Sequence, residues 1–260
     1  MRLMNPRRAV LAALVSAAAL HALPASAATL SVQGSAAFAD EVLHDHRAEI
    51  EAAAGHGLRV VTNTSQVGLL ALFEGTADLA MISTRLEDQI EPLRHQAPAL
   101  PLERLRAFGV ARSPVGLIVH PGNPVRAISF DDLRRVLRGE VTNWGEVGGR
   151  DVFIRVVATR DGAGVATAVA GRVIGRGAPI AAPGHPRVQR ASQVVTVVEQ
   201  DPAALGLAHP KITRGRAVAD LAPPAPIEQE LSFVTSGEPT PEAMAVIEAS
   251  RAVTGRVLGH

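Results

Sequence analysis

The 260-residue sequence contains no cysteine and no tyrosine, and it has only one tryptophan and six phenylalanines. The absence of cysteine excludes disulfide bonds and thiolate metal sites. The shortage of aromatic residues argues against a surface that stacks on sugars or nucleobases. The core must therefore be built from Ala, Val, Leu and Ile, and the chain is long enough for one large domain or for two lobes of roughly 100 residues each.

The sequence also lacks a membrane-spanning run after its first 28 residues, because no later stretch approaches about 18 apolar residues. Residues 1–28 combine three arginines with a shorter apolar run, Ala9 to Leu20, and an Ala25-Ser26-Ala27 cleavage signal. This is the pattern of a signal peptide. We expect general secretion, since Arg7-Arg8 lacks the rest of a twin-arginine consensus, and a lipid anchor is excluded by the missing cysteine.

Neither sign of charge is in marked excess. The whole chain has 26 basic and 25 acidic residues, and residues 1–28 hold three of the basic ones and none of the acidic ones. The chain without residues 1–28 therefore carries a net charge of −2. Without a basic surplus there is no reason to expect a nucleic-acid partner.

Apolar stretches and turn residues alternate along the chain in a strand–helix order, which predicts a mostly parallel sheet with helices on its faces. Strands are expected at residues 29–33, 58–62, 77–82, 106–111, 115–120, 151–158 and 230–235. Helices are expected at residues 38–54, 67–73, 130–137, about 164–174 and 239–253. Ser129 is expected to cap the helix at 130–137, and a turn precedes the helix at about 164–174. Residues 194–200 fit a helix and a strand equally well, since this apolar run is short.

Hydroxyl side chains follow three of the expected elements in the first half of the chain. Ser35, Ser65 and Ser83 each come after an expected strand, and Ser65 also precedes a helix. Ligands of such sheets bind beyond the carboxyl ends of the strands. Each serine also fits an N-cap, and both roles can hold together because a helix start favours an anion.

A glycine-bearing turn after the strand at 151–158 is the strongest candidate for an anion site. It contains Arg160, Asp161, Gly162, Ala163 and Gly164. The backbone N–H groups that open the next helix are free to bind an anion there. Two simpler interpretations stay open: glycines that only allow tight packing, and an Arg160–Asp161 ion pair.

Four segments in this order resemble the periplasmic phosphate-binding proteins that serve ABC transporters. They are F-E-G-T-A-D-L-A-M-I-S (Phe73–Ser83), L-R-G-E-V-T-N-W-G-E-V-G-G (Leu137–Gly149), Asp201–Gly206 and L-S-F-V-T-S-G-E-P-T-P (Leu231–Pro241). The resemblance implies a two-lobed, type II periplasmic-binding-protein fold with two crossovers. Residues 29–112 and 202–260 would form lobe 1, and residues 113–201 would form lobe 2.

The resemblance also implies a function: a periplasmic, monomeric, non-enzymatic protein without metal or cofactor that captures phosphate or a related oxyanion and delivers it to a membrane permease. Ser35, Ser65, Ser83 and the turn at 160–164 fall on or beside the family's ligand positions. Ala163 and Val165, however, stand where the family has hydroxyl residues in a G-S-G-T turn. Backbone N–H groups at Ala163 and Gly164 would remain as donors.

Two other classes of function compete with this one. A relative that has lost phosphate affinity could act as a sensory or scaffold protein, and the missing hydroxyls favour it. A hydrolase would need a catalytic or metal site, and the best metal-like cluster is His44-Asp45-His46. Residues two apart on a helix face different ways, so this cluster is expected to be a solvated helix face. Trp144 is expected to anchor a connector by packing rather than to bind ligand.

Overall fold

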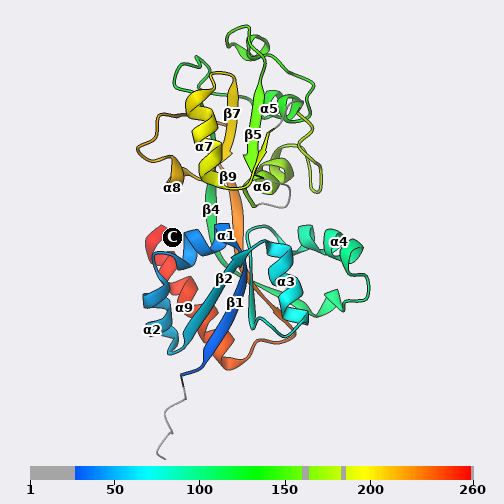
Figure 1. Ribbon diagram of the computed structural model, residues 1–260, viewed down its shortest axis with the longest axis vertical. Coiled ribbons are helices and arrows are strands. Elements are labelled where there is room, and N and C mark those ends of the chain that lie inside the picture. The colour runs from blue at the N-terminus through cyan, green and yellow to red at the C-terminus, as the bar shows by residue number, and fades with distance from the viewer. Residues whose placement is uncertain (1–26, 160–163, 183–185, 259–260) are drawn as a thin grey trace, which may run out of the picture.

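The computed structural model describes residues 27–159, 164–182 and 186–258. Two lobes are joined by two long strands, β4 (Leu105–Val119) and β9 (Ile227–Ser236), as Figure 1 shows. The predicted two-lobed α/β fold is confirmed. Residues 1–26 of the predicted signal peptide lie outside the described residues. Within the described part, no helix is both long and apolar enough to cross a membrane.

The first lobe is built on three parallel strands in the order β2-β1-β3, with β9 antiparallel beside β3. The strands are β1 (Thr29–Ser35), β2 (Gly57–Asn63) and β3 (Leu79–Ile82). The helical segments are α1 (Ala36–Phe38), the π-helical turn η1 (Ala39–Leu43), α2 (Arg47–Ala54), α3 (Ser65–Phe73), α4 (Leu86–Gln96), the short η2 (Leu102–Arg104) and α9 (Pro241–Leu258).

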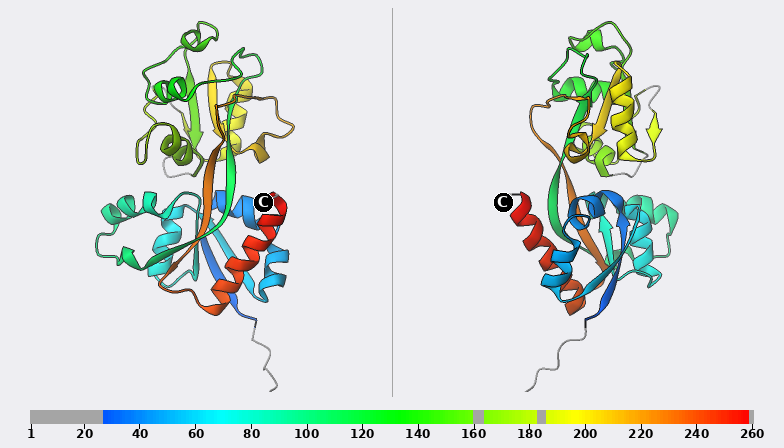
Figure 2. Two further views of the ribbon diagram at one scale, coloured as in Figure 1. Left: turned by 180° about the vertical axis from the view of Figure 1, so that it is seen from behind. Right: turned by 60° about the vertical axis from the view of Figure 1, so that its left-hand side comes forward.

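Both faces of this sheet are covered at β3, whose four residues are all buried. One face packs against α2 and α9, in a cluster that includes Val32 and Met81 and the ring pair Phe38–Phe233, whose centroids are 4.6 Å apart. The other face packs against α3 and α4 in a cluster that includes Ala80. The right-hand view of Figure 2 shows these helices on opposite sides of the strands.

The second lobe continues the sheet in the order β4-β7-β5-β6, with β8 paired to β4. Its strands are β5 (Arg155–Thr159), β6 (Arg187–Val188), β7 (Ala204–Ala208) and β8 (Ala219–Asp220). Its helical segments are α5 (Phe130–Leu137), η3 (Trp144–Val147), α6 (Gly164–Val173), α7 (Ala191–Gln200) and α8 (Pro210–Thr213). Along β7, Leu205 and Leu207 join the core under α5 and α6, while Ala204 and Ala208 face α7. This period-two alternation buries the strand on both faces.

Several expected elements differ from those observed. The helix expected at 38–54 is divided into α1, η1 and α2, and Asp45 in the break binds Lys211 Nζ at 2.6 Å. The strands expected at 106–111 and 115–120 form the single strand β4, because Ser113 and Pro114 keep their pairing with β9. Residues 194–200 belong to a helix, α7.

The return to the first lobe also differs from the expected position at residue 202. Ala204–Ala208 pairs with β5 and with the second-lobe end of β4, and β8 pairs with Ile118 and Val119. These pairings keep residues 204–220 in the second lobe. We therefore propose that the chain returns within β9.

The connection between the lobes narrows to a two-stranded ribbon. Residues 111–115 of β4 pair with residues 227–231 of β9, while β7 joins β4 only from Gly116 and β3 joins β9 only from Ser232. A register shift between Gly109 and Ala111 marks the first-lobe end of this ribbon. A ribbon held by one ladder can twist more freely than a wide sheet.

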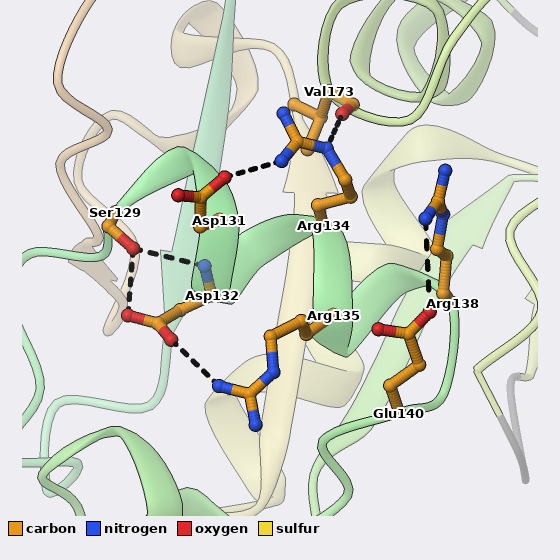
Figure 3. Close-up of polar contacts among 8 residues, drawn as sticks. All are labelled: Ser129, Asp131, Asp132, Arg134, Arg135, Arg138, Glu140 and Val173. Carbon is orange, nitrogen blue, oxygen red and sulfur yellow. Dashed lines mark hydrogen bonds and ion pairs between the residues drawn. The ribbon is translucent and has the colours of Figure 1, made fainter.

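Helix α5 fixes the position of α6 in the second lobe (Figure 3). Ser129 caps α5 by accepting from Asp132 N–H at 3.0 Å, as expected from the sequence. Arg134 Nε donates to the carbonyl of Val173 at the end of α6, at 2.8 Å, and Arg172 of α6 lies 4.7 Å from the centre of the Phe130 ring. The two contacts hold the C-terminal half of α6, whose first residue, Gly164, lies at the candidate site.

A close approach of α3 to β1 gives a test of this fold. A Cβ on Gly68 would lie 2.5 Å from Gln33 O and 2.7 Å from Gly34 Cα. We expect Gly68→Ala to lower the free energy of unfolding by about 1–3 kcal/mol, because the helix and strand would be forced apart. Urea denaturation of the purified protein measures this change.

The matched control is Gly255→Ala in α9, where nothing lies within 4 Å of an added Cβ. This substitution should raise stability by about 0.5–1 kcal/mol through helix propensity. Equal stability of Gly68→Ala and the wild type would contradict the packing described for α3.

Candidate functional site

Three serine hydroxyls meet at the carboxyl edge of the first-lobe sheet. Ser35 Oγ and Ser83 Oγ are 2.8 Å apart, and Ser83 N–H donates to Ser65 Oγ at 3.4 Å. All three residues are buried. Thr64 caps α3 by accepting from Val67 N–H, which leaves the Ser65 hydroxyl available for other contacts, whereas Ser35 Oγ also accepts from Phe38 N–H at 3.3 Å. The structure therefore brings together the serines that the sequence singled out.

Gly164 of the second lobe lies directly against this serine cluster. A Cβ on Gly164 would overlap Ser83 Oγ and would lie 2.7 Å from both Ser83 Cβ and Gln229 Oε1. Only a residue without a side chain allows the start of α6 to come this close. Arg160, Asp161, Gly162 and Ala163, the other predicted residues of the turn, lie outside the described residues, so their placement stays a prediction.

The structure separates Val165 from the serine cluster. Its side chain is buried in the second-lobe core with Val169 and Ala170. A threonine hydroxyl at this position would therefore compete with apolar packing.

Gln229 is a site residue that the sequence did not reveal. It is 2% exposed, and neither its Oε1 nor its Nε2 has a hydrogen-bond partner among the described residues. A buried amide without partners costs about 1–3 kcal/mol, so such groups are uncommon unless something else satisfies them. Its position depends on the pairing of β9 with β4, and a short E-Q-E sequence carries no signal of that pairing.

A cavity of about 320 Å³ adjoins this region between the lobes. It is lined by residues at and just before the start of α4, in and just after α6, and at the start of β9. These include Thr84, Arg85, Asp88, Thr167, Arg172, Arg176, Glu228, Gln229 and Glu230. Arg85 Nε forms an ion pair with Glu230 at 3.2 Å. Burial raises the pKa of the Asp88 carboxyl, and the nearby Arg176 and Arg85 act against this rise.

A second set of contacts joins the lobes near α8, on the left of Figure 1, away from α6 on the right. Lys211 N–H donates to His209 Nδ1 at 3.2 Å, so the proton of the neutral ring sits on Nε2, which donates to Ser113 Oγ on β4. Glu41 Oε1 of the first lobe lies 3.1 Å from the same Nδ1. Burial raises the pKa of the Glu41 carboxyl.

This serine–histidine–glutamate chain has the connectivity of a catalytic triad, yet it lacks access for a substrate. Ser113 is 2% exposed in the middle of a paired strand, and it does not line the inter-lobe cavity. Lys211 Nζ adds an ion pair to Asp45 at 2.6 Å and a hydrogen bond to Asp40 O at 3.2 Å. These contacts hold η1 of the first lobe against α8 of the second.

The remaining sequence candidates have structural roles in the described part of the chain. Trp144 is buried and its Nε1–H donates to Ala203 O at 2.9 Å, which confirms the packing role. Asp45 of the His44-Asp45-His46 cluster is engaged by Lys211. Among the described residues, no group of three or more His, Cys, Asp or Glu side chains is arranged to hold a metal ion.

Comparison with known proteins shows the family and the fold. Residues 21–250 match the PBP superfamily domain. The chain is 28% identical over 136 residues to the phosphate-binding protein PstS of Bacillus subtilis. This alignment covers 52% of the chain and 43% of that relative, so it spans less than half of the relative's length. The resemblance noted in the sequence is confirmed.

Solved structures share the fold. A putative phosphate ABC transporter substrate-binding protein with bound phosphate from Clostridium perfringens has a TM-score of 0.68 at 19% identity, covering 85% of this chain and 92% of that one. An ABC-type phosphate transport receptor from Vibrio cholerae has a TM-score of 0.64 at 20% identity, covering 88% and 97%. The OxyR2 regulatory domain of Vibrio vulnificus reaches 0.61 at 12% identity, covering 88% and 95%.

The buried His209 predicts a pH dependence of stability. Burial lowers the pKa of His209 from 6.5 to about 4. The unfolded chain takes up this proton as the pH falls below about 6.5, whereas the folded chain takes it up only near pH 4. We expect the free energy of unfolding to fall by up to about 3 kcal/mol across this window and to level off below it.

Denaturant unfolding of the wild type and of His209→Gln at several pH values between 7.5 and 3.5, roughly spanning the window, measures this contribution. Glu41, whose pKa is raised and which contacts His209, acts in the opposite direction, so the same comparison in a Glu41→Gln background separates the two groups. A wild type and a variant with parallel pH profiles would show that His209 titrates normally.

Proposed function

We propose that this chain, which belongs to the PBP superfamily, is an exported solute-binding protein that captures phosphate or a related oxyanion between its lobes and delivers it to an ABC permease. The observation that carries the proposal is the meeting of Ser35, Ser65 and Ser83 with Gly164 across the lobes. Hydroxyl groups and the N–H groups at the start of α6 are suitable donors for an oxyanion.

The names of the similar proteins support the same ligand class. Relatives from Bacillus subtilis and Vibrio cholerae are described as phosphate-binding and phosphate-transport proteins. In the proposed mechanism, the oxyanion bridges the serine cluster and the start of α6, so binding energy is gained only when the lobes are together. The β4–β9 ribbon would then act as the hinge of a closure that a permease can recognise.

Arg160, Asp161, Gly162 and Ala163 are proposed to complete the site. The guanidinium of Arg160 suits an oxyanion, and Asp161 could accept the proton of a hydrogen-phosphate. The alternative of a non-transporting sensory or scaffold protein receives no specific support from the contacts among the described residues. The likeness to an OxyR2 domain concerns the fold alone.

Replacement of Ser83 tests the proposal directly. A hydrogen bond to a charged group contributes about 1.5–3 kcal/mol, so Ser83→Ala should weaken phosphate binding by roughly 10- to 100-fold. Isothermal titration of the phosphate-stripped protein measures the affinity, and thermal unfolding checks that the variant is folded. The matched control is Ser192→Ala on the exposed side of α7, which should leave the affinity unchanged. Absence of heat from the wild type at millimolar phosphate would reject phosphate as the ligand.

A further inference from the structure

Arg172 and Arg176 at the inter-lobe cavity lack the carboxylate partners that arginines in and next to α5 have. The two arginines of α5 and Arg138, which follows the helix, each have a carboxylate partner close in the sequence: Arg134 with Asp131, Arg135 with Asp132 and Arg138 with Glu140 (Figure 3). Those side chains are already satisfied within the lobe.

Arg172 and Arg176, by contrast, have no hydrogen bond and no ion pair within 4 Å in the described part of the chain. Arg172 lies over the Phe130 ring. Arg176 lies near enough to Asp88 to act against the rise of the pKa of that carboxyl. Both line the cavity together with the unpartnered amide of Gln229. Donors and acceptors without partners therefore converge on one space.

The cavity adjoins the serine cluster through two of its lining residues, Thr84 and Gln229. Thr84, which lines the cavity, directly follows Ser83, and Gln229 Oε1 lies 2.7 Å from the position of a Cβ on Gly164. A volume of about 320 Å³ lies at the low end of the range of pockets that hold organic ligands, roughly 300–1,000 Å³. A single oxyanion at the serine cluster would leave this space unused.

The lining indicates the chemistry of what would fill it. Three arginines and three carboxylates balance in formal charge, so the cavity does not demand a second anionic group. Among the described residues, the lining contains no aromatic side chain for stacking, and its charged and amide groups do not suit a hydrocarbon chain. Carboxylates and the Gln229 carbonyl accept from hydroxyl groups, while guanidinium and amide N–H groups donate to them.

We infer that the inter-lobe cavity holds the hydroxyl-bearing organic part of a phosphate monoester, a polyol phosphate or sugar phosphate, whose phosphate group occupies the serine cluster. This inference rests on the proposed oxyanion site. Arg172 and Arg176 come from the second lobe, and Asp88 comes from the first, so the organic part would add bridging contacts between the lobes. Gln229 on the ribbon would gain partners for both of its polar atoms.

Isothermal titration of the phosphate-stripped protein with inorganic phosphate, glycerol phosphate, glucose phosphate and free glucose tests the inference. At least one ester should bind roughly tenfold or more tightly than inorganic phosphate, because the organic part adds hydrogen bonds, and free glucose should not bind. Arg172→Gln and Arg176→Gln should each weaken ester binding by roughly tenfold and change phosphate binding by less than about twofold.

Arg135→Gln on α5 is the matched control and should leave both affinities unchanged. Gln229→Met keeps a similar volume and removes the unpartnered amide, so it should raise Tm while weakening ester binding. Thermal unfolding shows whether each variant is folded.

The outcomes separate the inference from the proposed function. Binding of phosphate with no advantage for either ester, or full ester affinity in Arg172→Gln and Arg176→Gln, overturns the inference alone. Ester binding without phosphate binding supports it and narrows the ligand class. Absence of binding by phosphate and by both esters overturns the inference and the proposed function together.

Discussion

The antiparallel pairing of β4 with β9 is the constraint on which the rest of the structure depends. These strands are paired from Leu105–Ser236 at the first-lobe end to Val115–Ile227 at the second, and each lobe adds its remaining strands to one end of the pair. Separate apolar clusters lie on both faces of each lobe's sheet. Each lobe is therefore stabilised within itself, and the ribbon between them, whose end residues Val115, Ile227 and Leu231 belong to the two cores, is the segment held by a single ladder.

The same ribbon brings polar groups to the boundary between the lobes. Ser113 and Gln229 are directly opposite in register, and both are buried. Ser113 is held by His209 in the α8 contact, whereas Gln229 faces Gly164 and the cavity. Ser113 thus belongs to an inter-lobe contact whose hydrogen bonds are formed. Gln229, its neighbour across the ribbon, belongs to a cavity where its own polar atoms have no partner among the described residues.

Much of the fold follows from local patterns in the sequence. The strands β1, β2 and β3 and the helices α3 and α5 were predictable, because each has an apolar run with a cap or a glycine at its end, and Thr64 and Ser129 do cap their helices. The grouping of Ser35, Ser65 and Ser83 followed from the rule that parallel strands present their carboxyl ends at one edge. The caps and the ends of the elements depend on residues close together in the chain, and the grouping of the serines adds only the rule for parallel strands.

The features that were not predictable depend on distant residues. The five residues of β7 are all buried, and their Ala and Leu side chains do not indicate which lobe they complete. The break in the helix expected at 38–54 coincides with a contact between Asp45 and Lys211, far along the chain. Gln229 becomes a candidate site residue only through the register of β9. The cavity forms only because residues near the start of α4 and residues of α6, which are far apart in the chain, lie around the same space.

Most of the buried polar atoms without hydrogen-bond partners among the described residues lie near the candidate site. In the described part of the chain, buried side-chain atoms without hydrogen-bond partners occur on Asn63, Gln89, Gln229 and Ser250. Asn63 ends β2 opposite Ser35, Gln89 donates to Thr84 at the cavity, and Gln229 lines the cavity. Only Ser250, in α9, is remote from this edge. Each such group costs stability in the isolated protein, so their concentration where the lobes meet favours a polar solute as the partner that satisfies them.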